Sequence, residues 1–67
     1  MRIVLRNYQT GDYFQTGTKW TKEQKEALNF DHHEGAIRLA RELRLPNIEL
    51  CHLGENGEVL LGTRIET

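Results

Sequence analysis

Hydrophobic and polar residues alternate at the start of the chain, which is the pattern of a half-buried β-strand. Residues 2–6 place Ile3 and Leu5 on one face and Val4 on the other. A polar turn that contains glycine follows, and residues 13–16 combine two aromatic rings with a β-branched residue, as returning strands often do. The chain is therefore predicted to begin with a β-hairpin.

The last third of the chain repeats this alternation. Residues 48–53 and 58–65 flank the turn Gly54-Glu55-Asn56-Gly57, whose Asn-Gly pair is the strongest short-range signal for a hairpin. Leu60 is predicted to face away from the core. The residues predicted to face inward on these two strands are Ile48, Leu50, Val59, Leu61 and Ile65.

A helical period separates the two hairpins. Asp31 and Glu34 form a capping box, and Pro46 is predicted to stop the helix that follows. We therefore expect an amphipathic helix from Asp31 to about Leu45. The apolar residues that recur at helical spacing, and so predict its buried face, are Ala36, Leu39, Ala40 and Leu43.

The segment between the first hairpin and this helix is ambiguous. Lys19-Trp20 is expected to resume extended structure after Gly17, and Thr21-Lys22-Glu23-Gln24 fits a second capping box for one or two helical turns. The pattern stalls at Ala27-Leu28-Asn29-Phe30, which either ends that helix or forms a short strand. We favour the short strand.

These elements predict a two-layer α+β fold. A small antiparallel sheet of two hairpins, with the short strand as an optional extra, packs one face against the main helix. The chain of 67 residues is expected to form a single domain, residues 1–67. A domain of this size buries only about 60% of the surface of its unfolded chain. Its stability is therefore expected to be modest or to be increased by a partner.

The residue types for catalysis or metal binding do not occur at useful spacings. The chain has one cysteine and no serine, and Cys51 and His52 are expected on opposite faces of one strand. His32 and His33 are adjacent on the predicted helix, where neighbours point about 100° apart and do not chelate together. We therefore predict no enzyme, no catalytic or metal site and no cofactor.

Charge and hydropathy limit the partners further. The formal net charge is −1 at pH 7, and no apolar run has the length of a signal peptide or membrane span. We therefore expect a cytoplasmic location and no membrane partner. The sequence favours an interaction module that forms a homodimer or binds another protein through a sheet edge or a free sheet face. The residues predicted for that contact are Val4, Leu60 and the edge of residues 58–65.

Nucleic-acid binding is the alternative function. Basic side chains alternate with aromatic rings in the first half of the chain, a combination that stacks bases and neutralises phosphates. The acidic excess of residues 31–67 disfavours this function, because that part of the chain has seven acidic and only four basic side chains. The residues that would carry it are Arg2, Arg6, Lys19, Trp20 and Lys22.

Two resemblances accompany this pattern. The run Tyr13-Phe14-Gln15, Trp20-Thr21 and Ala27-x-x-Phe30, followed by a capped helix, is similar to many short uncharacterised bacterial and phage proteins. That resemblance implies that residues 27–30 are extended. The chain also resembles, more faintly, the hybrid-binding N-terminal domain of ribonucleases H, which implies nucleic-acid binding. The residues that carry this second likeness are Gly11-Asp12-Tyr13, Trp20, Phe30 and Asp31.

Overall fold

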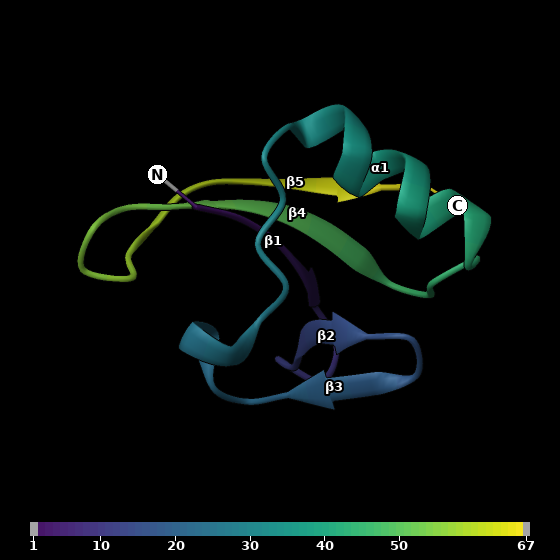
Figure 1. The fold of residues 1–67 in the computed structure, drawn as a ribbon, viewed down its shortest axis with the longest axis horizontal. Coiled ribbons are helices and arrows are strands. Elements are labelled where there is room, and N and C mark those ends of the chain that lie inside the picture. The colour runs from purple at the N-terminus through teal and green to yellow at the C-terminus, as the bar shows by residue number, and fades with distance from the viewer. Residues whose placement is uncertain (1, 67) are drawn as a thin grey trace.

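The computed structural model describes residues 2–66 and arranges them as one antiparallel sheet with an α-helix on one face (Figure 1). The strand order is β3-β2-β1-β4-β5, and every neighbouring pair is antiparallel. This confirms the predicted two-layer α+β class. The elements are β1 (Arg2–Asn7), β2 (Tyr13–Thr16), β3 (Lys19–Thr21), the short 3₁₀ helix η1 (Gln24–Glu26), α1 (His33–Glu42), β4 (Ile48–Leu53) and β5 (Val59–Ile65).

The two predicted hairpins meet at the centre of the sheet. β1 pairs with β4 along its whole length, from Arg2 opposite Leu53 to Asn7 opposite Ile48. The first hairpin therefore extends the sheet on one side through β2 and β3, and the second extends it on the other through β5. The additional strand is β3, which contains the expected extended Lys19-Trp20.

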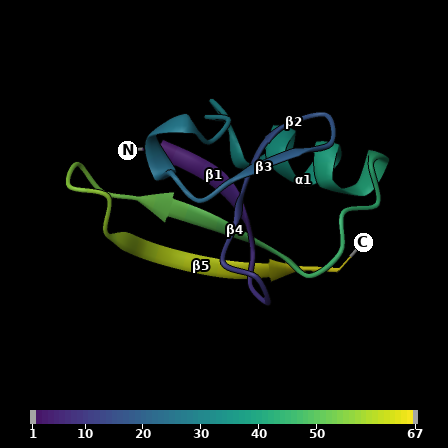
Figure 2. The same cartoon turned by 90° about the horizontal axis from the view of Figure 1, so that it is seen from below.

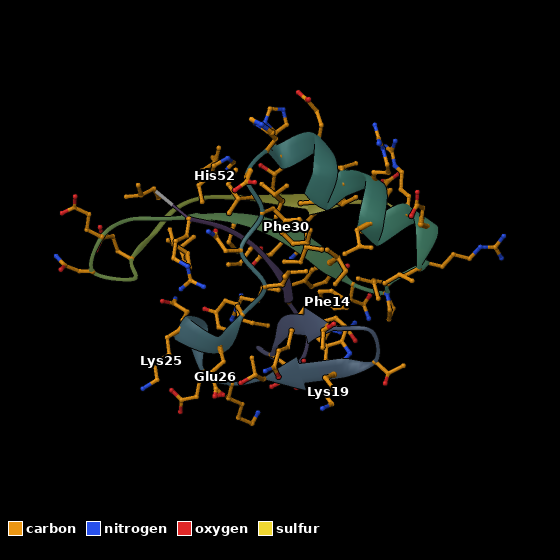
Figure 3. The ribbon with its side chains drawn as sticks, viewed as in Figure 1. Phe14, Lys19, Lys25, Glu26, Phe30 and His52 are labelled. Carbon is orange, nitrogen blue, oxygen red and sulfur yellow. The ribbon has the colours of Figure 1, made fainter. Side chains whose placement is uncertain are left out.

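The main core lies between the sheet and α1. Phe14 is 1% exposed, and its ring meets the ring of Trp20 edge to face with centroids 5.6 Å apart. Phe14 belongs to this core and Phe30 packs against it, and Figure 3 labels Phe14 beside β2 and Phe30 beside the segment that precedes α1. Small residues on the helix allow it to approach the sheet closely. The buried members of this cluster are Ile3, Leu5, Phe14, Ala36, Ala40, Leu45, Ile48 and Leu50.

A second, smaller cluster covers the opposite face of the sheet, where an exposed Val4 was predicted. Val4 is instead completely buried, so it is not available to a partner. It packs with Tyr13, Ala27, Cys51 and Leu53. The prediction was wrong because the segment around η1 folds back over this face, which the period of the strand does not reveal.

Hydrogen bonds of Arg2 hold this covering segment in place. Its guanidinium donates to the carbonyls of Gln24 (3.0 Å) and Ala27 (3.1 Å). The chain then passes beside β1, where the Phe30 N–H donates to the Ile3 carbonyl at 2.9 Å. Ala27 thus belongs to the small cluster, whereas Phe30 packs against the main core on the other face.

Both predicted capping boxes are wrong. η1 has Glu23 at its N-terminal boundary with no side-chain cap, and Thr21 Oγ1 instead accepts from the Glu23 N–H at 3.1 Å. α1 begins at His33, after an extended His32, also without a side-chain cap. The favoured strand at residues 27–30 is reduced to a single bridge between Phe30 and Ile3. The Leu28 N–H donates to the Phe14 carbonyl of β2 instead, so the segment divides its bonds between β1 and β2.

The C-terminal end of the helix also differs from the prediction. α1 ends at Glu42, and Leu43, predicted to be in the core, is 45% exposed. Leu45 is buried in its place, because the backbone turns through a left-handed conformation at Arg44 (φ 51°). The helix thus ends before Leu43, and the short turn to β4 directs Leu45 into the core in its place.

The inward-facing pattern of β5 is wrong in part. Ile65 packs against the main core, but Val59 is 52% exposed and Leu61 is 56% exposed. The cause is the position of α1, which packs on β1 and β4 and does not reach the start of β5. Apolar side chains that the sequence assigned to the core therefore remain on the surface.

Candidate functional site

The two edges of the sheet are protected to very different degrees. At one edge, β3 has three residues, includes the charged Lys19, and pairs with β2 through an irregular register. At the other edge, β5 has seven residues and no proline or lysine. Natural edge strands usually avoid unwanted pairing by being short, bulged, proline-containing or lysine-containing. β5 is therefore the exposed edge, and it forms the outer margin of the sheet in Figure 2.

The hydrogen bonds of β1 show which backbone groups of β5 point outward. The backbone carbonyl of Ile3 accepts from the Phe30 N–H, and the backbone N–H of Ile3 donates to the Asn29 side chain. Both backbone groups of Ile3 therefore point away from β4. In an antiparallel ladder these directions alternate along each strand. Val4 and its partner Cys51 therefore bond to each other.

The same alternation continues across β4 into β5. The backbone N–H and C=O groups of Leu50 and His52 point toward β5, where they bond to Thr63 and Leu61, respectively. Gly62 lies between these two residues of β5, and Arg64 follows Thr63. Because the directions alternate, the N–H and C=O groups of Gly62 and Arg64 point to the free edge.

A bulge blunts only the first part of this edge. Leu61 pairs with His52 and Val59 pairs with Leu53, so Leu60 is an extra residue in the β5 strand. From Leu61 to Ile65 the register is regular. This regular part of β5, residues 61–65, is available for a further strand to pair with it.

Exposed apolar side chains accompany the free edge. Leu60, predicted as a contact residue, is 59% exposed, and Val59 and Leu61 beside it are also more than half exposed. Three consecutive apolar residues are thus exposed on this small sheet, more than a scattered surface leucine would account for. We call Val59, Leu60, Leu61 and the backbone edge of residues 61–65 the β5 edge.

A shallow apolar groove separates β5 from the helix. Its volume is about 130 Å³, well below the roughly 300 Å³ at which small-molecule sites usually begin. The Nδ1 atom of His52 is buried there with no hydrogen-bond partner among residues 2–66. The groove is lined by His33, Ile37, Leu50, His52, Thr63 and Ile65. Its size favours a protein side chain over a metabolite as an occupant.

On the other face of the sheet, one partly buried ion pair joins β1 to β4. Arg6 Nη1 donates to Glu49 Oε1 at 2.7 Å, and the hydrogen bond with Glu49 raises the pKa of Arg6. Arg64 lies opposite Glu49 in the ladder, but its guanidinium stacks over the Tyr8 ring, 4.2 Å from the centroid. The Arg6–Glu49 pair links residues 43 positions apart, and no local spacing in the sequence signals it.

Cys51 lies beside this ion pair in a dry environment. Its side chain is fully buried, and Sγ lies 3.7 Å from Glu49 Oε1. Burial first, and then the nearby Glu49 carboxylate, raise the pKa of the thiol from 9.0 to about 11. The thiol is therefore protonated at neutral pH, which is the opposite of what a nucleophilic cysteine needs.

Cys51 is expected to react slowly in the folded protein. At about pH 8 the thiolate fraction is roughly 100-fold lower for a pKa of about 11 than for 9.0, and burial slows the reaction further. The measurement is the rate with an aromatic disulfide reagent, native and in urea. The native rate should still rise about tenfold per pH unit at pH 10, because the thiol keeps titrating there. Rapid native labelling at pH 8 would contradict the protonated, buried thiol.

The basic residues proposed for nucleic-acid binding do not form one surface. Arg2 and Arg6 are bound to carbonyls and a carboxylate within the chain, and Lys22 pairs with Asp12 at 3.0 Å. Trp20 packs partly buried against the main core. Lys19 is exposed and extends away from the sheet in Figure 3. The structure therefore does not gather these five side chains at one place.

No group of three or more His, Cys, Asp or Glu side chains among residues 2–66 is arranged to hold a metal ion. No helix in that part of the chain is both long and apolar enough to cross a membrane.

Comparison with protein-family models, curated proteins and solved structures finds no match to this chain. The resemblances to phage proteins and to ribonuclease H domains therefore stay predictions, and the proposal below depends on geometry alone.

Proposed function

We propose that this protein is a non-enzymatic interaction module that associates with itself through the β5 edge. The observation that carries the proposal is a seven-residue edge strand with exposed Val59, Leu60 and Leu61, whose regular part, residues 61–65, has no bulge, proline or lysine. Addition of a strand to such an edge satisfies backbone groups and buries the apolar side chains together. Val4, predicted earlier as part of the contact, is excluded because it is buried.

Two further observations support this function. The domain is small, and the helix leaves the start of β5 uncovered, so association would supply apolar burial that the single chain lacks. The opposite edge, β3, offers only three residues for pairing. An assembly through β5 would therefore stop at a closed dimer instead of extending into a filament.

Nucleic-acid binding through the basic and aromatic residues of the first half is the less favoured function. Arg2, Arg6 and Lys22 already have partners within the chain, and contacts with phosphates would have to displace them. The formal net charge of −1 adds no general attraction to phosphate. The geometry therefore favours self-association.

Replacing Gly62 by Pro tests the proposal. The N–H of Gly62 points to the free edge, so proline removes a donor that a partner would use but that β4 does not. A Cβ at this position would lie no closer than 3.5 Å to any side chain, an ordinary contact. The wild type is expected to form a dimer in sedimentation equilibrium, and Gly62→Pro is expected to weaken it at least tenfold, about 1.4 kcal/mol.

The control is Thr63→Pro, which removes an N–H that faces β4 and should lower the melting temperature instead. If Gly62→Pro does not fold, Leu61→Lys adds a charge at a 56% exposed side chain and serves as the second variant. A wild-type monomer at high micromolar concentration would refute the proposal, as would a dimer that neither variant weakens.

A further inference from the structure

Resting on the self-association proposed above, we infer that β5 pairs antiparallel with β5 of a second copy about a twofold axis at Thr63. The two five-stranded sheets would then join into one continuous sheet. The inference adds a register to the proposed function, and with it the identity of the partner. Three features of the β5 edge support it independently: its outward backbone groups, the position of its bulge, and the charges beside Gly62.

The outward backbone groups are related by this axis. Gly62 and Arg64 direct their N–H and C=O groups to the free edge, and they flank Thr63. A twofold axis at Thr63 places Gly62 opposite the partner's Arg64, and Arg64 opposite the partner's Gly62. Both pairs then exchange two backbone hydrogen bonds, as hydrogen-bonded pairs of an antiparallel ladder do.

The bulge excludes registers centred earlier in the strand. An axis at Leu61 would bring Leu60, the extra residue of the bulge, into the ladder opposite the partner's Gly62. A bulged residue interrupts the regular alternation of outward N–H and C=O groups, so this register loses hydrogen bonds. The axis at Thr63 uses residues 61–65, the part of β5 in which the pairing with β4 is regular.

The charges next to Gly62 are complementary to Arg64 of a second copy. A Cβ at Gly62 would lie 3.5 Å from Glu49 Oε2, so the missing side chain leaves this carboxylate oxygen open toward the free edge. Residues that face each other in a ladder lie on the same face of the sheet. The partner's Arg64 would therefore lie over Gly62, within reach of Glu49.

The interaction of Arg64 with the partner's Glu49 would be stronger than the interaction that Arg64 makes within the single chain. There the guanidinium stacks over the ring of Tyr8, whereas a charge-assisted hydrogen bond to a carboxylate is generally the stronger interaction. Glu49 accepts from Arg6 through Oε1, and no contact of Oε2 competes with the partner within residues 2–66. The twofold axis forms the contact twice.

The helix-facing side of the same register is apolar. Leu61 lies opposite the partner's Ile65, which covers a leucine that is 56% exposed in the single chain. Cross-strand pairs of such side chains stabilise antiparallel sheets. The same chain thus supplies both halves of every contact: outward glycine with arginine, the carboxylate of Glu49 in β4 with guanidinium, and leucine with isoleucine. This self-complementarity identifies the partner as a second copy of the chain.

Cysteine cross-linking tests the register. At the axis, the two Thr63 residues form a non-hydrogen-bonded pair with Cα atoms about 4.5 Å apart, inside the range of disulfides. Thr63→Cys is therefore expected to form a covalent dimer within minutes of adding diamide, which accepts the two electrons and two protons. Leu61→Cys is the matched control, also on an exposed residue of β5, and its Cα atoms would be about 14 Å apart.

The fraction of covalent dimer on a non-reducing gel is the readout, and Cys51, being buried, contributes little background. Strong cross-linking of Thr63→Cys with at least tenfold less for Leu61→Cys supports the register. Preferential cross-linking of Leu61→Cys, or no cross-linking of Thr63→Cys in a protein that sediments as a dimer, overturns the register but leaves self-association intact. A monomer in sedimentation overturns both.

Discussion

Phe14→Ala is expected to lower the free energy of unfolding by about 3–5 kcal/mol, the usual cost of removing a fully buried phenylalanine. Phe14 is 1% exposed and lies at the centre of the main core, where its ring packs edge to face against Trp20. A domain of 67 residues has a total stability of about 3–10 kcal/mol. The loss therefore lies between about a third of this stability and all of it, so the variant should unfold at a much lower urea concentration than the wild type.

The fluorescence of Trp20, the only tryptophan, is the measurement for this prediction. Urea titration should bring Phe14→Ala to the red-shifted emission of an exposed indole at a much lower urea concentration than the wild type. Leu43→Ala is the control, since Leu43 occupies a helical core position in the sequence pattern but is 45% exposed in the structure. It should cost less than about 1 kcal/mol. Equal destabilisation by both variants would contradict the core described above.

Val4→Asp is expected to destabilise the protein by about 4 kcal/mol or more, because it places a carboxylate in an apolar site. Val4 is 0% exposed and packs with Cys51 and Ala27 under the segment that contains η1. Arg2 and Arg6 are the nearest basic residues along the strand, but Arg2 donates to the carbonyls of Gln24 and Ala27 and Arg6 donates to Glu49. Neither is therefore free to pair with the new charge.

Leu60→Asp is the matched control for Val4→Asp, because both residues were predicted to share one contact surface. Leu60 is 59% exposed, so its aspartate variant should keep the circular dichroism spectrum and melt within a few degrees of the wild-type monomer. Thermal melts at low concentration, where dimer is scarce, compare the two variants directly. A stable Val4→Asp variant would show that the small cluster is open to solvent.

The contrast between Val4 and Leu60 shows what a strand period leaves undecided. Alternation correctly separates Ile3 and Leu5 from Val4, but it does not say whether anything covers the second face. That depends on residues 24–28, which fold back over the sheet through side-chain hydrogen bonds of Arg2. A contact of this kind between distant parts of the chain leaves no periodic signal.

The ends of the helix are a second feature that the side-chain pattern does not determine. The apolar spacing correctly places the helix and its buried Ala36 and Ala40. Its ends depend on backbone conformations that side-chain patterns indicate poorly, and α1 starts and stops without the predicted cap or the buried Leu43.

The sequence by itself therefore determined the class of the fold: two hairpins around one amphipathic helix, because periods of two and of three to four are local properties of the chain. It also predicted that Leu60 and the edge of residues 58–65 belong to a contact surface, which is still a proposal. Only the tertiary structure decided that β5 is the less protected edge, that Val4 is covered, and that Glu49 lies beside Gly62. These facts depend on strand order and on where α1 rests, both of which arise from packing between distant segments.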